Sequence, residues 1–100
     1  MNTSFEAPYY NFIQNEGIKS IEIYNKFLNW IQGEFDLYQI DDLDGLKVYY
    51  PNGWFTIKII NKDADIINFE IRVKNKSKNS GFKTYQKIEA LYAHLIKGLS

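Results

Sequence analysis

The sequence predicts an α+β domain of two layers, in which two main helices cover one face of an antiparallel sheet of three or four strands. Two observations lead to this fold class. An Asn-Gly pair at Asn52 and Gly53 separates two apolar runs, which predicts a β-hairpin, and a third strand with alternating apolar residues follows it. Two other segments, one on each side of these strands, repeat apolar residues at helical spacing.

The beginning of the chain, residues 1–17, is predicted to be an N-terminal extension or a short helix. Thr3 and Glu6 have the spacing of a capping box, and Pro8 suits the first turn of a helix. A helix over 8–15 that ends at Gly17 is therefore expected.

The first main helix is predicted to begin after Ser20 and to end at Gly33. The Ser20 hydroxyl can accept a hydrogen bond from a free N–H of the first turn. The apolar residues of this segment then recur every three or four positions, so that they form one stripe. The stripe consists of Ile21, Ile23, Tyr24, Phe27, Leu28, Trp30 and Ile31.

The middle of the chain is predicted to form the strands. Phe35 and Leu37 predict a short strand over 35–40, and Asp44 with Gly45 indicates a turn. Residues 46–50 and 54–60 form the two strands of the hairpin, and a polar connection over 61–65 follows. The third strand has one buried face, because its apolar residues alternate with polar ones. These apolar residues are Ile67, Phe69, Ile71 and Val73.

The second main helix is predicted at the end of the chain, after a polar loop over 75–81 with Ser80 as its cap. Its apolar residues again recur at helical spacing and indicate one buried side. They are Tyr85, Ile88, Leu91, Tyr92, Leu95 and Leu99.

The composition excludes several classes of protein. With 100 residues, 45% of them hydrophobic, the chain is too short for two domains and too apolar to be disordered, so residues 1–100 are expected to form one domain. No Cys and a single histidine, His94, leave no disulfide, no thiol nucleophile and no zinc ligand set. The glycines form neither of the two common phosphate-binding loops. We expect no enzyme activity and no cofactor.

The acidic residues Asp41, Asp42 and Asp44 are the one cluster of carboxylates in the sequence. A catalytic acid needs a raised pKa, and a calcium loop needs a defined series of oxygen ligands ending in Glu. A run of acids beside a turn provides neither, so these side chains are expected to be solvated. No metal site is predicted.

The first residues lack the basic and apolar regions of a secretory signal, and the apolar runs are far shorter than the ~18 residues that a membrane span requires. A cytoplasmic location without membrane contact is expected. The size and composition are compatible with a protein of a virus or mobile element.

The neutral net charge results from cancellation between the two halves of the chain. Residues 1–50 have a net charge of −5 and residues 51–100 a net charge of +5. This asymmetry predicts a polarised surface, which favours oriented protein contact or self-association over binding by a uniformly basic surface.

One face of the predicted sheet combines aromatic and charged side chains. If the apolar residues of the strands face the helices, the alternate residues face outward. The predicted inward set is Val48, Phe55, Ile57, Ile59, Phe69, Ile71 and Val73. The predicted outward set is Lys47, Tyr49, Trp54, Thr56, Lys58, Asn68, Glu70, Arg72 and Lys74.

A resemblance to a known family is carried by residues 44–58, which read DGLKVYYPNGWFTIK. The chain resembles the C-terminal domain of the α-D-phosphohexomutases, the phosphomannomutase and phosphoglucomutase superfamily. In that domain a helix leads to D-G-[VL]-[KR], a strand, a turn with Trp, a second strand, an R-P-S-G-T-E-P loop, a third strand and a final helix. The order of elements is similar from about residue 20 to residue 99. The resemblance implies a TATA-binding-protein-like α+β fold.

The chain departs from that family at its phosphate-binding loop. In the family, the Arg, Ser, Gly and Thr of the loop hold the substrate phosphate. Here the corresponding residues 58–64 read KIINKDA, and only Lys58 and Lys62 are basic. The phosphoserine and magnesium-binding parts of the mutases belong to their other domains. The resemblance therefore implies a degenerate, stand-alone domain without mutase activity.

The leading hypothesis for function is a non-catalytic domain that binds another protein, or a second copy of itself, through the outward face of the sheet. The predicted contact residues are Tyr49, Trp54, Lys58 and Arg72, because large aromatic residues and Arg dominate interface energies.

Two alternatives remain open at the level of the sequence. The first is weak sugar-phosphate binding by Lys58, Asn61 and Lys62. The second is nucleic-acid binding through the basic segment, which the neutral net charge disfavours. The cations of that segment are Lys74, Lys76, Lys78, Lys83 and Lys87.

Overall fold

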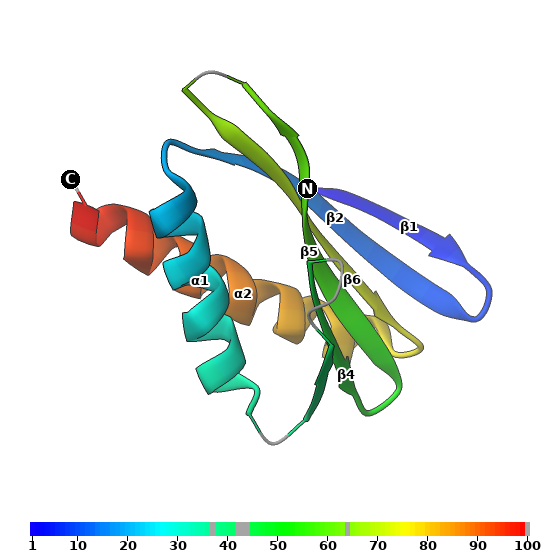
Figure 1. The fold of residues 1–100 in the computed structure, drawn as a ribbon. Coiled ribbons are helices and arrows are strands. Elements are labelled where there is room, and N and C mark those ends of the chain that lie inside the picture. Colours follow the sequence, from blue (N-terminus) through cyan, green and yellow to red (C-terminus); the bar gives the residue numbers. More distant parts are fainter. Residues whose placement is uncertain (37, 42–44, 64, 100) are drawn as a thin grey trace.

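The structure is a computed structural model that describes residues 1–36, 38–41, 45–63 and 65–99. Its elements, in chain order, are β1 (Asn2–Glu6), β2 (Tyr9–Ile18), α1 (Ile21–Glu34), β3 (Gln39–Asp41), β4 (Leu46–Tyr50), β5 (Gly53–Lys62), β6 (Ile67–Asn75) and α2 (Lys78–Leu99) (Figure 1). The predictions made on Leu37, Asp42, Asp44, Ala64 and the side chain of Leu99 lie outside the described residues.

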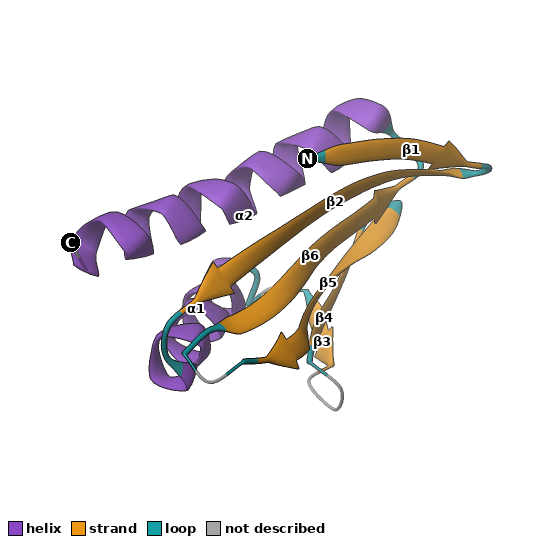
Figure 2. Cartoon of the chain, turned by 90° about the horizontal axis from the view of Figure 1, so that it is seen from above, coloured by secondary structure: helices purple, strands orange, loops and turns teal. Residues whose placement is uncertain are grey.

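The strands form one antiparallel sheet with the order β1-β2-β6-β5-β4-β3. Both helices lie on the same side of this sheet (Figure 2). The predicted α+β class is thus confirmed, but the predicted three or four strands are wrong, because the described residues form six. The two added strands come from the first eighteen residues, and β2 pairs with β6 in the middle of the sheet.

The helix predicted over 8–15 is wrong, because these residues lie in the turn after β1 and in β2. β2 pairs with β6 from Tyr10 opposite Asn75 to Ile18 opposite Ile67. This long ladder and the burial of Phe12 and Ile18 outweigh the local capping-box signal. Residues 1–17 are therefore part of the sheet and not an extension.

The hydrophobic core lies between the helices and one face of the sheet. Phe69 of β6 is fully buried at its centre, with the rings of Tyr24, Phe27 and Tyr92 at 5.3, 5.8 and 5.7 Å from its own. Because these rings come from α1 and α2, Phe69 joins both helices to the sheet. The strand residues of the predicted inward set are buried here, with Ile59 partly buried.

The caps show why the helices begin where they do. The Glu22 N–H donates to the Ser20 hydroxyl at 3.1 Å, which confirms Ser20 as the N-cap of α1. The second helix begins earlier than predicted, at Lys78, since the Ser77 hydroxyl accepts from the Ser80 N–H at 3.3 Å. The buried side chain of Asn75 positions the residues before α2, because its Oδ1 accepts a hydrogen bond from the Ser77 N–H at 2.7 Å.

The β4–β5 hairpin forms at the predicted position. Asn52 has a φ of 69°, the left-handed conformation that an Asn-Gly turn requires. The short strand predicted over 35–40 is found slightly later, as β3, which pairs with β4 at the edge of the sheet.

Candidate functional site

The face of the sheet away from the helices has no layer over it among the described elements. The register places the side chains of this face in rows that cross the strands. One row runs from Tyr49 through Trp54 to Lys74, because Tyr49 lies opposite Trp54 and Trp54 opposite Lys74. The next row contains Asp41, Lys47, Thr56 and Arg72. The predicted outward set therefore shares one face, which we call the open face.

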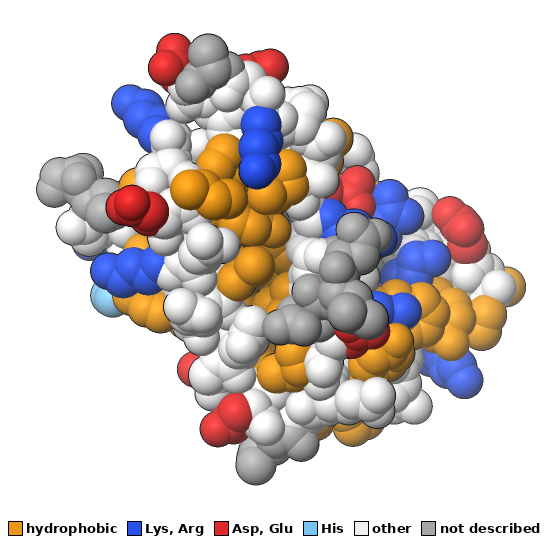
Figure 3. All heavy atoms as spheres, viewed as in Figure 1, with side chains coloured by type: hydrophobic (Ala, Val, Ile, Leu, Met, Phe, Trp, Pro, Cys, Tyr) orange, Lys and Arg blue, Asp and Glu red, His pale blue; other side chains and the backbone are white. Residues whose placement is uncertain are grey.

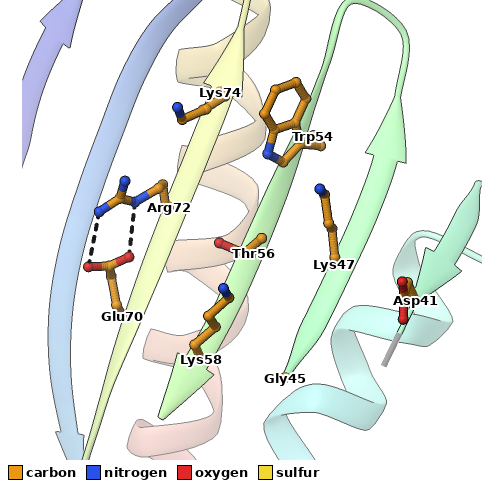
Figure 4. A pocket seen from close by; sticks show the side chains of 9 residues that line it. All are labelled: Asp41, Gly45, Lys47, Trp54, Thr56, Lys58, Glu70, Arg72 and Lys74. Atoms are coloured by element: carbon orange, nitrogen blue, oxygen red, sulfur yellow. Dashed lines mark hydrogen bonds and ion pairs between the residues drawn. The ribbon is translucent and has the colours of Figure 1, made fainter. Parts of the chain in front are cut away.

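A pocket of about 500 Å³ lies on the open face (Figure 4). Trp54 stands at one end of it, and Lys47, Lys58 and Lys74 line it from three different strands. In Figure 3, Lys and Arg side chains gather on the side of the molecule opposite the helices. The complete lining is Asp41, Gly45, Lys47, Trp54, Thr56, Lys58, Glu70, Arg72 and Lys74.

Trp54 is held in a cluster of cations and aromatic rings. The ammonium nitrogens of Lys47 and Lys74 lie 5.1 and 5.8 Å from the centre of its ring. Tyr9 contacts it edge to face, with 4.9 Å between the ring centroids. Lys47 also lies 4.8 Å from the ring of Tyr49. Cation–π contacts hold the lysines over the rings and leave their charge facing the pocket.

The charges of the pocket are not balanced. Four cationic side chains and two carboxylates line it. Arg72 and Glu70 form an ion pair, with Nε and Oε1 3.0 Å apart. The lining thus has two more cations than carboxylates, so the pocket favours an anionic group.

The four predicted contact residues are on the open face, but they differ in position. Trp54, Lys58 and Arg72 line the pocket, whereas Tyr49 lies beside it and is 37% exposed. The charge of Arg72 is engaged by Glu70, which the sequence did not indicate.

The residues predicted for phosphate binding are not gathered in this pocket. Asn61 and Lys62 are exposed at the far end of β5, and only Lys58 lines the pocket. The Asn61 amide oxygen accepts a hydrogen bond from the Asn68 amide at 2.7 Å. A site made of these three residues has no enclosing wall among the residues that the structure describes.

Sequence reasoning missed Tyr9, which reaches Trp54 from β2. Tyr9, Asn11 and Ile13 lie on the same face of β2 as the open face, a placement that a helix over 8–15 does not predict. The basic segment proposed for nucleic acid is also divided: Lys74 is on the open face, whereas Lys87 of α2 forms an ion pair with Glu34 of α1 at 3.0 Å.

A second hollow lies between α1 and β5. Its volume is about 390 Å³, and Tyr24, Leu28, Gly45, Lys58 and Ile59 line it. Figure 3 shows hydrophobic side chains gathered in this hollow. Gly45 and Lys58 also line the pocket of the open face, so the two hollows adjoin at these residues.

The most perturbed carboxyl group lies on the helix side of the sheet. Partial burial, and then the charge of nearby Glu16, raise the pKa of Glu89. Within the described part of the chain, its Oε1 is buried without a hydrogen-bond donor. Burial also raises the pKa of Tyr85 to about 12. This cluster lines neither pocket, so it carries no role in binding there.

No three His, Cys, Asp or Glu side chains are close enough to hold a metal ion in residues 1–36, 38–41, 45–63 and 65–99. Of the helices in those ranges, none has the length and apolar character needed to cross a membrane.

No family model and no curated protein matches the chain. The resemblance to the phosphohexomutase C-terminal domain therefore stays a prediction.

Proposed function

We propose that the chain is a non-catalytic binding domain that holds an acidic segment of a partner protein on its open face. The observation that carries the proposal is the cluster around Trp54, where Lys47 and Lys74 lie 5.1 and 5.8 Å from the indole ring and border a pocket of about 500 Å³. One ligand can thereby contact a large aromatic side chain and several cations at the same time.

The charge of the pocket supports an acidic ligand. Lys47, Lys58 and Lys74 come from three adjacent strands, so their positions relative to one another are set by the ladder and not by a loop. Carboxylates that approach this space can form charge-assisted hydrogen bonds with more than one lysine. Such contacts also accelerate the encounter with an acidic segment.

The shape supports a segment and not a whole domain surface. A hollow of this volume accommodates only a few side chains of a ligand. Trp54 and Tyr49 would supply apolar contact area, as rigid aromatic residues do at the centre of many interfaces. The sequence-based hypothesis is therefore retained, with Lys47 and Lys74 added to its contact residues.

The same contacts disfavour a single-stranded nucleic acid. Bases bind sheet faces by stacking on aromatic rings. At Trp54 and Tyr49, lysine ammonium groups already lie over the rings, and a base would have to displace them. Carboxylates, in contrast, can pair with the lysines where they are.

The experiment uses the fluorescence of Trp54 and amide shift mapping by NMR. A Trp30→Phe background leaves Trp54 as the sole tryptophan. A glutamate-rich peptide should change the Trp54 emission and shift the amides of Lys47, Trp54 and Lys74. Lys47→Glu should weaken binding by at least about tenfold, which corresponds to roughly 1.4 kcal/mol. Lys26→Glu is the matched control, because Lys26 is exposed on α1.

Two other probes separate the competing ligands. An oligothymidine that binds with steep salt dependence, while the glutamate-rich peptide does not bind, would replace the proposal with nucleic-acid binding. A hexose phosphate that shifts Lys58, Asn61 and Lys62 without shifting Trp54 would support the sugar-phosphate alternative. No spectral change with the peptide at about millimolar concentration would overturn the proposal. The cytoplasmic location expected from the sequence stays a prediction.

A further inference from the structure

The two edges of the sheet differ in length and exposure. The edge formed by β3 is only three residues long. The other edge is β1, whose five residues are all exposed and which pairs with β2 alone among the described strands (Figure 2). The outer side of β1 therefore presents backbone N–H and C=O groups that have no strand partner in the part of the chain that the structure describes.

β1 has few of the features that usually protect an edge strand, since Glu6 at its end is its only charged residue. Natural edges carry Lys, Pro or a bulge that prevents a further strand from pairing. The residues of β1, Asn2–Glu6, include neither Lys nor Pro. Its five pairs with β2 follow one another without a register shift, so no bulge interrupts the strand. The edge is thus competent to pair with another strand.

An apolar strip lies beside this edge, on the helix side of the sheet. Phe5 is 56% exposed and packs on Tyr10, with 4.7 Å between their rings. Phe82, near the start of α2, is 39% exposed and has its ring 6.1 Å from that of Phe12. Because Phe5 is paired with Tyr10 and Thr3 with Phe12, these side chains share one face.

We propose that β1 is a self-association site at which a second copy of this chain pairs antiparallel with it, so that the sheet continues from one copy into the other. The proposal does not depend on the function proposed for the open face. A strand that docks here must satisfy the backbone of the edge and also place an apolar side chain on the helix side. A second copy of β1 does both.

The sequence of β1 allows two copies of the strand to pair with each other in antiparallel orientation. Antiparallel pairing centred on Ser4 places Thr3 opposite Phe5 of the second copy, and Asn2 opposite Glu6 of the second copy. Glu6 is the only charged side chain of the strand, and its two copies lie at opposite ends of the pair. Like charges therefore do not meet across the new ladder, where they would destabilise it.

The symmetry of such a pair brings the apolar strips together. The two-fold axis of an antiparallel strand pair is perpendicular to the sheet, so both helix layers lie on the same side. Phe5 and Phe82 of both copies then flank the junction. The open faces also join on the other side, which places the two Trp54 pockets on one continuous surface.

Sedimentation equilibrium from about 1 µM to about 500 µM protein tests the proposal, with amide hydrogen exchange measured at both ends of the range. We expect a monomer–dimer equilibrium, with protection of β1 amides that increases with concentration. Phe5→Lys should raise the dissociation constant at least about tenfold. Ile60→Lys is the matched control, because Ile60 is also exposed, at 51%, but lies on β5. Thr3→Lys should repeat the effect if Phe5→Lys is misfolded by circular dichroism.

Three results would overturn the inference. One is a monomer at every concentration. Another is a dimer that Ile60→Lys weakens as much as Phe5→Lys and Thr3→Lys do. The last is a dimer whose β1 amides exchange equally fast at low and high concentration.

Discussion

At the scale of single residues, the backbone of the hairpin constrains one glycine most strongly. Gly53 begins β5, and a Cβ atom there would overlap the carbonyl oxygen of Lys74 and lie 2.9 Å from the Cα of Asn75. Both neighbours belong to the central strand β6 and cannot move without breaking the ladder. β5 and β6 can therefore approach each other this closely only if the residue before Trp54 is glycine.

We expect Gly53→Ala to destabilise the fold by more than about 2 kcal/mol, since the added methyl group meets backbone and not a flexible side chain. Urea denaturation followed by circular dichroism measures this. Gly98→Ala is the control, because a Cβ at Gly98 has nothing within 4 Å. That substitution in a helix should be neutral or stabilising by about 0.5–1 kcal/mol. Equal effects of the two substitutions would contradict the argument.

Glu89 gives a second prediction at this scale, which concerns pH. Partial burial raises the pKa of Glu89 in the folded chain above its ordinary value of 4.5. Ionisation of this group therefore opposes folding: the cost is absent below pH 4.5, grows between pH 4.5 and the raised pKa, and is complete above the raised pKa. Glu89→Gln should be more stable than the wild type at about pH 7 and equally stable at about pH 4.

Chemical denaturation at several pH values measures this difference. A Glu89→Gln variant that is less stable than the wild type at neutral pH would show that the carboxylate makes a favourable contact which outweighs its burial.

At the scale of elements, the strands at the beginning of the chain were the hardest to predict. The helix-side positions of β2 include Gln14 and Glu16 beside Phe12, and the opposite side includes Ile13. This mixture hides the period of two on which strand prediction depends. In β6 the alternation is complete. This strand lies between β2 and β5, and the helices cover one of its faces, so every second side chain is buried. That strand, the Asn-Gly hairpin and the Ser20 cap were therefore predictable.

The candidate site was partly predictable at the same scale. Alternation alone placed Trp54, Lys58 and Arg72 on one face, and the structure confirms this placement. Alternation could not show that Glu70 pairs with Arg72, or that Tyr9 contacts Trp54. Those contacts depend on which strands are neighbours and on their register.

At the scale of the whole molecule, the acidic and basic halves of the sequence are interleaved in the fold. Residues 1–50 are acidic and residues 51–100 basic, but the sheet order inserts β6 and β5 between β2 and β4. The halves are also tied by the Lys87–Glu34 ion pair between the helices. The polarised surface stays a prediction, and the pocket lining shows a local excess of cations on the open face.

The core that joins the two layers gives a prediction at this scale. Phe69 is fully buried and contacts aromatic rings of both helices. Phe69→Ala should lower the free energy of unfolding by about 3–5 kcal/mol, since the helices and the sheet cannot close the cavity that the lost ring would leave. The exposed Phe5→Ala, measured on dilute protein, should change it by less than about 0.5 kcal/mol. A loss at Phe69 no larger than that at Phe5 would refute the assigned core.

The sequence by itself determined the local elements whose signals are carried by neighbouring residues: the capped helix after Ser20, the hairpin at Asn52, the alternating third strand and the amphipathic last helix. It also determined which side chains of those strands face away from the core. Only the tertiary structure decided that the first residues complete the sheet and that Lys47 of β4 and Lys74 of β6 both lie near the ring of Trp54. The physical reason is that strand partners and register depend on contacts between residues far apart in the chain, which no local pattern encodes.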